Sequence, residues 1–218
     1  MRPRAGWVMK GDAEHALQGN LGAGGRRRNP ADVLQDYPKE VILRDGTGVT
    51  LRPLGRGDQQ ALLEMFGRLS EDELWFLNHD LSHSGLIDEW IRNLDPNRVI
   101  SIVALLEGRI IGNAVLMLKS YGAKSHIGKV RISVDPAFRE IRLATWMLLD
   151  LINLAMAIGL RKLVMRLVQD RDISIINGVK KLDFSEAAIL ENYVLDKAGN
   201  PHNLVILTKE LPTRWIDL

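Results

Sequence analysis

A strand that runs directly through a turn into a long helix, near the middle of the chain, constrains the fold more than any other feature. Residues 126–134 place apolar side chains on one face and polar side chains on the other, as in a half-buried strand. The Asp135-Pro136 pair ends that strand. An amphipathic helix is expected over residues 142–158, and Gly159 ends it at the C′ position.

This strand-turn-helix junction has a chemical consequence. The first turn of a helix leaves backbone N–H groups without intrahelical partners and carries partial positive charge, so it can hold a pyrophosphate. Most helix N-termini bind only water. The junction alone therefore allows a phosphate ligand without requiring one.

Strands and helices follow one another along the rest of the chain, with no internal repeat. The segment around Trp75 and Phe76 receives no assignment. Helices are expected from Asp58, as N-cap, to about Leu69, and over residues 84–94, 142–158 and 173–181. Strands are expected over residues 41–43, 49–53, 99–106, 110–118, 126–134, 162–168, 184–193 and 204–209.

Length and composition limit the class of protein. The 218 residues suit one domain with an appendage, and we assign residues 1–36 to a flexible, basic, Gly-rich tail and residues 37–218 to a single domain. The net charge of +2 is too even to favour bulk nucleic-acid binding. The sequence has no cysteine, which excludes disulfides, thiolate metal sites and cysteine nucleophiles. No apolar stretch long enough for a membrane span or secretory signal is present, so a cytoplasmic location is the default.

The junction resembles a motif of the GNAT superfamily of acyl-CoA-dependent N-acyltransferases. In that family a strand ending Val-x-Pro-x-(Phe/Tyr) leads into (Gln/Arg)-x-x-Gly-x-(Gly/Ala). The resemblance spans about residues 37–211, and its opening is similar to GNAT domains of bacterial protein acetyltransferases. The matching runs are Val134-Asp135-Pro136-Ala137-Phe138-Arg139-Glu140-Ile141-Arg142-Leu143-Ala144, Leu51-Arg52-Pro53-Leu54, Lys181-Leu182-Asp183-Phe184 and the segment from Asp196 to Ile206.

The resemblance implies an α/β (α+β) fold, with a mixed, mostly antiparallel central sheet of about seven strands flanked by four helices. It implies acetyl-CoA or another acyl-CoA as co-substrate, and a protein lysine or small amine as acceptor. The backbone of residues 132–134 would pair with the pantetheine, and the turn after it would cradle the pyrophosphate. The residues assigned to the cofactor are Ile132, Ser133, Val134, Arg139, Glu140, Ile141, Arg142, Leu143, Ala144, Thr145 and Asp172.

Several positions depart from the family pattern. Arg142 stands where the family has its first motif glycine, so its guanidinium either blocks CoA or binds its phosphates. Lys129 replaces the glutamate that serves similar proteins as general base, and Val179 lies where many relatives have the tyrosine that protonates the leaving thiolate. Asp172 replaces a common asparagine, and Asp183 replaces a glycine. The usual base and the usual acid are therefore both missing.

Substitute acid and base groups are available elsewhere. His126, His79 and His83 are candidate bases because histidine titrates near neutral pH, and Tyr193 is a candidate acid. Glu140 is expected to cap the helix N-terminus, where a carboxylate is favourable. The five histidines include no i, i+4 pair followed by a suitable third ligand, so we predict no metal site.

Two hypotheses about function remain. The first is an N-acyltransferase that moves an acyl group from acyl-CoA to an amine; a lysine acceptor is under about 0.1% neutral at pH 7, so a missing base slows this reaction without forbidding it. The second is a catalytically impaired GNAT-fold protein that serves as a CoA-binding sensor or protein-interaction module. RNA binding through the basic tail and the basic residues Lys129, Arg131, Arg139 and Arg142 is disfavoured, because no stacking aromatics lie among them. The oligomeric state is left open, a homodimer included.

Overall fold

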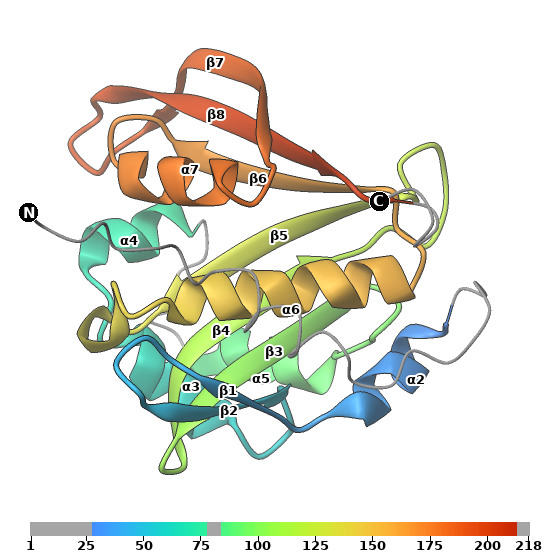
Figure 1. Ribbon diagram of the computed structural model, residues 1–218. Coiled ribbons are helices and arrows are strands. Elements are labelled where there is room, and N and C mark those ends of the chain that lie inside the picture. The colour runs from blue at the N-terminus through green and yellow to red at the C-terminus, as the bar shows by residue number, and fades with distance from the viewer. Residues whose placement is uncertain (1–27, 78–83, 213–218) are drawn as a thin grey trace, which may run out of the picture.

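Eight strands form one mixed sheet in the computed structural model, which describes residues 28–77 and 84–212. Their order across the sheet is β1-β2-β3-β4-β5-β6-β8-β7, and every neighbouring pair is antiparallel except β5 and β6 (Figure 1). The predicted mixed, mostly antiparallel sheet is confirmed, with eight strands in place of about seven. The strands are β1 (Lys39–Ile42), β2 (Gly48–Pro53), β3 (Val99–Leu106), β4 (Arg109–Met117), β5 (Ile127–Val134), β6 (Lys162–Val168), β7 (Ser185–Leu195) and β8 (Pro201–Glu210).

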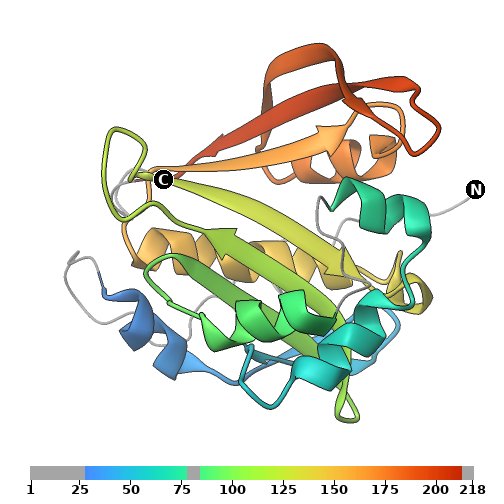
Figure 2. The same cartoon turned by 180° about the vertical axis from the view of Figure 1, so that it is seen from behind.

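The helices cover the sheet on both faces, as Figures 1 and 2 show. Helix α6 lies against one face, and α3 and α5 lie against the other. No helix of the described part of the chain has the length and apolarity needed to cross a bilayer. The helices are α2 (Pro30–Val33), α3 (Gln59–Phe66), α4 (Glu71–Phe76), α5 (Ser84–Arg92), α6 (Leu143–Ala157) and α7 (Ile173–Lys180), with 3-10 turns at Leu34–Asp36 and Pro136–Phe138.

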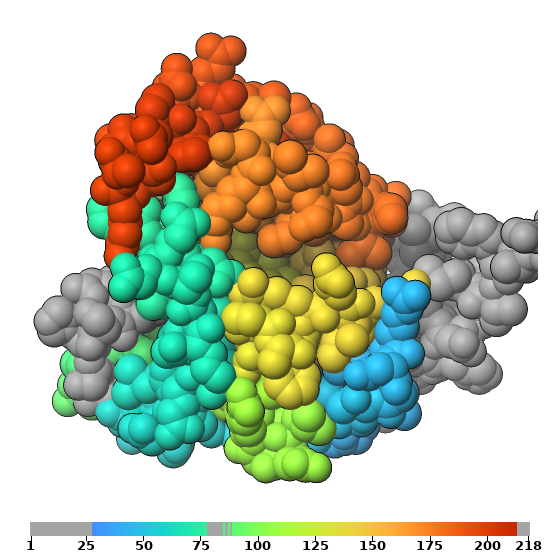
Figure 3. All heavy atoms as spheres, turned by 90° about the vertical axis from the view of Figure 1, so that its left-hand side faces the viewer, coloured from blue at the N-terminus to red at the C-terminus, as the bar shows by residue number. Residues whose placement is uncertain are grey.

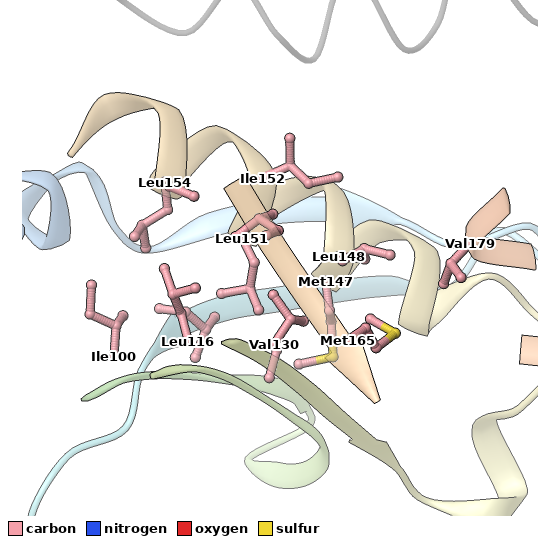
Figure 4. Packing of buried hydrophobic residues seen from close by; sticks show 14 of the residues in the cluster. Ile100, Leu116, Val130, Met147, Leu148, Leu151, Ile152, Leu154, Met165 and Val179 are labelled. Atoms are coloured by element: carbon pink, nitrogen blue, oxygen red, sulfur yellow. The ribbon is translucent and has the colours of Figure 1, made fainter. Parts of the chain in front are cut away.

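The larger core lies between α6 and the sheet. Met147 and Leu151 recur at helical spacing, are 0% exposed, and point from α6 toward Leu116 and Val130 of the sheet (Figure 4). The helix approaches the sheet closely at Gly112, where a Cβ atom would lie 2.8 Å from the Met147 Sδ. Because cores of this density tolerate little movement, α6, β4 and β5 form a rigid base for the junction between β5 and α6. The smaller core, on the opposite face, contains Leu54, Leu62, Met65, Phe66, Leu69, Ile87, Ile91, Val103 and Ile110.

The domain begins earlier than the predicted boundary at residue 37. Asn29 caps α2 by accepting a hydrogen bond from the Ala31 amide, and Val33 is buried in the larger core. The Arg28 amide also donates to the Ala157 carbonyl at the end of α6. The prediction of a flexible tail is therefore wrong for residues 28–36, because a single buried valine anchors this segment to α6. Residues 1–27 lie outside the described part of the chain.

A buried carboxylate on α6 holds the start of β1. Asp150 accepts hydrogen bonds from the Tyr37 hydroxyl and, at 2.7 Å, from the Lys39 ammonium. The Lys39 Nζ also lies 4.2 Å from the centre of the Tyr37 ring. Burial and the Asp150 charge raise the pKa of the Tyr37 hydroxyl, which keeps it protonated as a donor.

Helix α4 occupies the segment that received no sequence assignment. Ser70 and Glu73 form a capping box, in which the Ser70 hydroxyl accepts from the Glu73 amide and the Glu73 carboxylate accepts from the Ser70 amide. The Ser-x-x-Glu pattern that signals this helix is visible in the sequence. The helix is only six residues long, so its apolar periodicity gave no signal.

Asp58 is the N-cap residue of α3, as expected, but its side chain does not cap the helix. The Asp58 carboxylate makes no cap hydrogen bond to α3. It instead accepts two hydrogen bonds from the Arg52 guanidinium, at 2.6 and 2.7 Å, and one from the Gly55 amide. A charged bidentate partner outcompetes the helix amides for this side chain.

Candidate functional site

Strands β5 and β6 separate after three residue pairs, and this separation creates the candidate site. The parallel pairing covers only Ile127–Lys129 with Lys162–Val164. Beyond it, β5 still pairs with β4 on its other side, and β6 still pairs with β8. Figure 1 shows the two strands diverging, and Figure 3 shows a hollow between the orange atoms of β6 and α7 and the yellow atoms at the start of α6. Backbone N–H and C=O groups along the separated edges can therefore pair with an extended ligand.

The amino end of α6 lies at the open end of this separation. Arg142 is the N-cap of α6 and has φ 70° and ψ 14°, the left-handed conformation that favours glycine. Glu140, two residues earlier, also has a positive φ of 64°. The backbone thus adopts a conformation that suits glycine although the side chain is arginine, at a cost of about 1–2 kcal/mol. The helix geometry leaves the first N–H groups of α6 without intrahelical partners.

Asp135 stabilises the turn between β5 and α6. Its side chain is 1% exposed and accepts from the Arg68 Nε at 2.6 Å, the Arg109 guanidinium at 2.9 Å and the Ala137 amide at 3.0 Å. Burial raises the pKa of Asp135, but these three donors outweigh burial and lower it overall. The sequence identified Asp135 only as part of a strand-ending motif, because Arg68 and Arg109 are distant in the chain.

Arg139, a predicted cofactor residue, is exposed and already has an anionic partner. Its guanidinium forms an ion pair with Glu73 of α4 and also reaches the Val134 carbonyl at 3.3 Å. Burial raises the pKa of Glu73, but the Ser70 hydrogen bonds and the Arg139 charge lower it overall, so Glu73 is anionic. A carboxylate of α4 therefore sits beside the turn that was expected to hold phosphates.

Helix α4 links the two halves of the molecule that separate at β5 and β6. We call these halves the β1–β5 arm, which includes α6, and the β6–β8 arm, which includes α7. On the first arm, the Arg131 guanidinium donates to the Leu77 carbonyl at 3.0 Å, just after α4. Contacts to the second arm are Arg171 Nε to Asp72 at 3.1 Å, Trp75 Nε1 to the Leu195 carbonyl at 2.7 Å and Lys197 Nζ to Glu71 at 2.7 Å.

The other predicted cofactor residues divide into two groups. Ile132, Ser133 and Val134 lie on the open part of β5 and are half-buried. In the turn and first helical turn, Ala144 is exposed and Thr145 is half-buried, while the Leu143 side chain is 1% exposed and belongs to the core. Leu143 can therefore contribute only its backbone.

Two expectations about the turn need adjustment. Glu140 does not cap α6: it precedes the N-cap Arg142 by two residues, and the helix has no side-chain cap hydrogen bond. The left-handed backbone at both residues carries the chain into the helix instead. Ile141 packs its side chain against the larger core, and its carbonyl accepts from the Arg44 amide at 3.2 Å.

Asp172 and Val179 lie on the second arm. Asp172 is the N-cap residue of α7, is 9% exposed, and accepts from the Val168 amide at 2.8 Å. Burial raises the pKa of Asp172. Val179 is 6% exposed and packs in the core beside Ile176, so this position, where many relatives have an acidic tyrosine, offers only an apolar side chain.

The candidate acid and base residues are not brought together. His126 precedes β5 at the closed end of the β5–β6 pair, where its carbonyl accepts from the Arg161 amide; Ile132 lies about 20 Å away at the strand rise per residue. Tyr193 is 60% exposed on β7, the edge strand. His79 and His83 lie outside the described residues. Within the described ranges, no three His, Asp or Glu side chains gather as a metal site would require.

Comparison with known proteins places the fold. No family model and no curated protein matches the sequence. Solved structures do match: an N-acetyltransferase from Staphylococcus aureus Mu50 has 21% identity and a TM-score of 0.66, covering 75% of this chain and 99% of its own. The GNAT domain of PAT from S. lividans has 16% identity and a TM-score of 0.66, and the match covers 80% of this chain and 97% of that domain. YncA from Salmonella typhimurium is described as an acetyltransferase and was solved with its cofactor acetyl-CoA. It has 18% identity and a TM-score of 0.65, and the match covers 77% of this chain and 96% of YncA. The chain therefore has the GNAT fold, as the motif at the junction predicted.

Proposed function

We propose that this GNAT-fold protein transfers an acetyl or other acyl group from acyl-CoA to a primary amine. The observation that carries the proposal is the path formed by the open edge of β5 and the left-handed N-cap of α6. One end of this path offers strand-type backbone hydrogen bonds, and the other offers helix N-terminal amides. Pantetheine amides and a pyrophosphate are the chemical groups that such a sequence of sites fits.

Different residues of the path bind different parts of the acyl-CoA. Residues 132–134 hold the pantetheine through their backbone, which is independent of the side chains present. The amides at the start of α6 face the pyrophosphate, and Ala144, being small and exposed, leaves space for it. Arg139 and Arg142 bring guanidinium groups, which bind phosphate oxygens well, to the same turn.

The acyl-CoA supplies an activated thioester. In the transfer the amine nitrogen forms a bond to the acyl carbon, the C–S bond breaks, the thiolate leaves with the bonding pair, and the amine loses one proton to solvent or to the thiolate. A backbone N–H on the open edge of β5 is placed to donate to the carbonyl oxygen as negative charge develops there.

Lys129 occupies the position of the family's general base and acts differently. It is the last β5 residue paired with β6, so it stands where the path begins. Burial lowers the pKa of Lys129, and the charges of Arg166, Lys119 and Lys124 lower it further. Such a cationic surrounding also lowers the pKa of an acceptor ammonium, which raises its neutral, nucleophilic fraction.

One observation favours a second candidate, a CoA-binding sensor without catalysis. Val179 is buried, so the second arm supplies no acid at that position, and α4 is bonded to both arms across the open end. A protein of this kind binds acyl-CoA and couples binding to the position of α4, without releasing CoA.

The test of the proposed function combines binding with turnover. Isothermal titration with acetyl-CoA is expected to show micromolar affinity, and thiol detection is expected to show CoA release when an amine panel is added. Ala144→Glu should abolish binding while preserving the fold, because a carboxylate at a helix N-terminus is stabilising but repels phosphate. Ala144→Gln, of the same size but without the charge, is the control: it should weaken binding through loss of space alone, and so less than Ala144→Glu does. Binding without turnover would select the sensor, and absence of binding up to millimolar concentration would reject both.

A further inference from the structure

Three basic residues near the point where β5 and β6 separate lie on the face of the sheet opposite α6, and two more lie in the loop before β5. Val130 and Ile132 of β5 contact the α6 core, so the residues between and beside them point to the other face. Met165 of β6 contacts the same core, and its neighbour likewise points away. This cationic patch consists of Lys129 and Arg131 on β5, Arg166 on β6, and Lys119 and Lys124 between β4 and β5.

No carboxylate neutralises the cationic patch among the side chains that the structure describes, those of residues 28–77, 85, 87 and 89–212. Arg139, Arg171 and Lys197 each form an ion pair with a carboxylate of α4. By contrast, no described carboxylate lies within ion-pair distance of any patch residue, and Arg131 donates to a backbone carbonyl. Burial and the charges of its basic neighbours, Arg166 first among them, lower the pKa of Lys129. Among the described side chains, the patch is therefore a surplus of positive charge.

The patch is also accessible from the side away from the cofactor path. Lys129 and Arg166 are exposed, and Arg131 is half-buried. Figure 2 shows α3 and α5 in front of β3 and β4, and α4 beside the end of β5. Val134, beside the start of α6, and Lys129 are about 16 Å apart along the strand. A pantetheine arm running inward from α6 therefore ends close to the patch.

We infer that the acceptor of this site is a primary amine carried beside carboxylate groups, as in an acidic peptide or an acidic amino acid. The inference rests on the proposed function and specifies its substrate class. A lone ammonium is repelled by the patch, whereas flanking carboxylates pair with the guanidinium groups of Arg131 and Arg166. Lys129, which stays outside these pairs, lowers the pKa of the amine and raises its neutral fraction beside the thioester.

Three peptides test this inference at constant acceptor amine. Each begins Ala-Gly and ends in an amide, with Asp-Glu-Asp, Gln-Asn-Gln or Arg-Arg-Arg between, and free glutamate is the small-molecule arm. CoA release and product mass are measured, and binding of the fluorescently labelled peptides to CoA-saturated protein is measured separately. The acidic peptide is expected to bind and react at least about tenfold better than the neutral one, with the basic one last, and this preference should shrink between about 50 and about 300 mM salt.

A charge reversal localises the effect. Arg166→Glu is expected to reduce the acidic-peptide preference at least about tenfold and to improve the basic peptide. Lys181→Glu makes the same change of charge at the end of α7, on the α6 face, and is expected to leave the ranking of peptides unchanged. Equal effects of the two variants would show that only net charge matters and would overturn the inference.

The outcomes separate this inference from the proposed function. Acetyl-CoA binding with equal use of all three peptides would overturn the acceptor class and leave the function standing. Absence of acetyl-CoA binding would overturn both. If acetyl-CoA binds but no acceptor reacts, the binding measurement decides: a preference for the acidic peptide supports the inference, and its absence, or binding of a short RNA in place of the peptide, overturns it.

Discussion

Glu73 on α4 forms an ion pair with Arg139 in the turn before α6, and so places an anion beside the predicted phosphate site. The pair is partly exposed, so its own contribution to stability is small. Its effect on binding is larger in principle, because a phosphate entering this turn competes with Glu73 for the same guanidinium.

Removing this competitor should tighten cofactor binding. Glu73→Gln leaves a capping box, since glutamine serves at that position, but removes the negative charge. We expect acetyl-CoA to bind about threefold to tenfold more tightly, measured by isothermal titration, and this gain should shrink as the salt concentration rises. Glu71→Gln, which removes the partner of Lys197 on the same helix, is the control. Unchanged or weaker binding in Glu73→Gln would show that Arg139 does not contact the ligand.

The left-handed backbone at Arg142 predicts an unusual order of stabilities. Arg142→Gly and Arg142→Val both remove the same side-chain contacts, so comparing them isolates the backbone. At a φ of 70° the glycine variant should be more stable than the valine variant by about 1–2 kcal/mol, the reverse of the order in an extended strand. Urea denaturation of the two variants measures the difference. A more stable valine variant would mean that residue 142 is not left-handed.

Asp135 should be the most sensitive carboxylate of the junction. Arg68→Ala leaves this buried charge with the more exposed Arg109, and we expect a loss of about 3 kcal/mol in the free energy of unfolding at pH 7. Because the folded-state pKa of Asp135 is lowered, its contribution is present above the unfolded pKa and is lost as pH falls through the folded value. The difference between wild type and Asp135→Asn should therefore shrink below about pH 4. A difference independent of pH would contradict this ion-pair role.

His202 should give the β7–β8 hairpin a pH dependence of the opposite sign. Its Nδ1 lies 2.7 Å from Asp170 and its Nε2 3.4 Å from Asp196, and these hydrogen bonds raise its pKa. The contact is fully present below the unfolded value of about 6.5 and is lost as pH rises through the folded value. Hydrogen exchange in residues 196–202 should therefore accelerate with pH more than base catalysis of exchange explains.

His202→Gln supplies the control for that measurement. It keeps a hydrogen-bonding side chain but cannot be charged, so the additional acceleration should disappear. An NMR titration of the wild-type ring should also give a pKa above the value of an unperturbed histidine. A normal ring pKa would contradict the arrangement with Asp170 and Asp196.

Local sequence patterns predicted the helices and strands well where the apolar periodicity extends over many residues. The helix from Leu143 to Ala157, ending before Gly159, and the strands around it follow directly from such patterns. Short elements were harder: α2 and α4 are too brief to show periodicity, and their caps at Asn29 and Ser70 carry the signal instead. Asp58 fits a capping pattern in the sequence, but its carboxylate binds Arg52 instead of the helix amides. This contact forms only because β2 packs beside the start of α3.

Residue types and local spacing are enough to predict the GNAT fold, the strand-turn-helix junction, and a lysine and a valine where the resemblance implies a glutamate and a tyrosine. The surroundings of the junction depend on how the chain packs: the left-handed backbone of Arg142, the Glu73–Arg139 pair, the buried Asp135 and the cationic patch. The last three join segments far apart in the chain, and electrostatic energies depend on distance and burial in space. A linear sequence specifies the charges, while packing decides which of them meet.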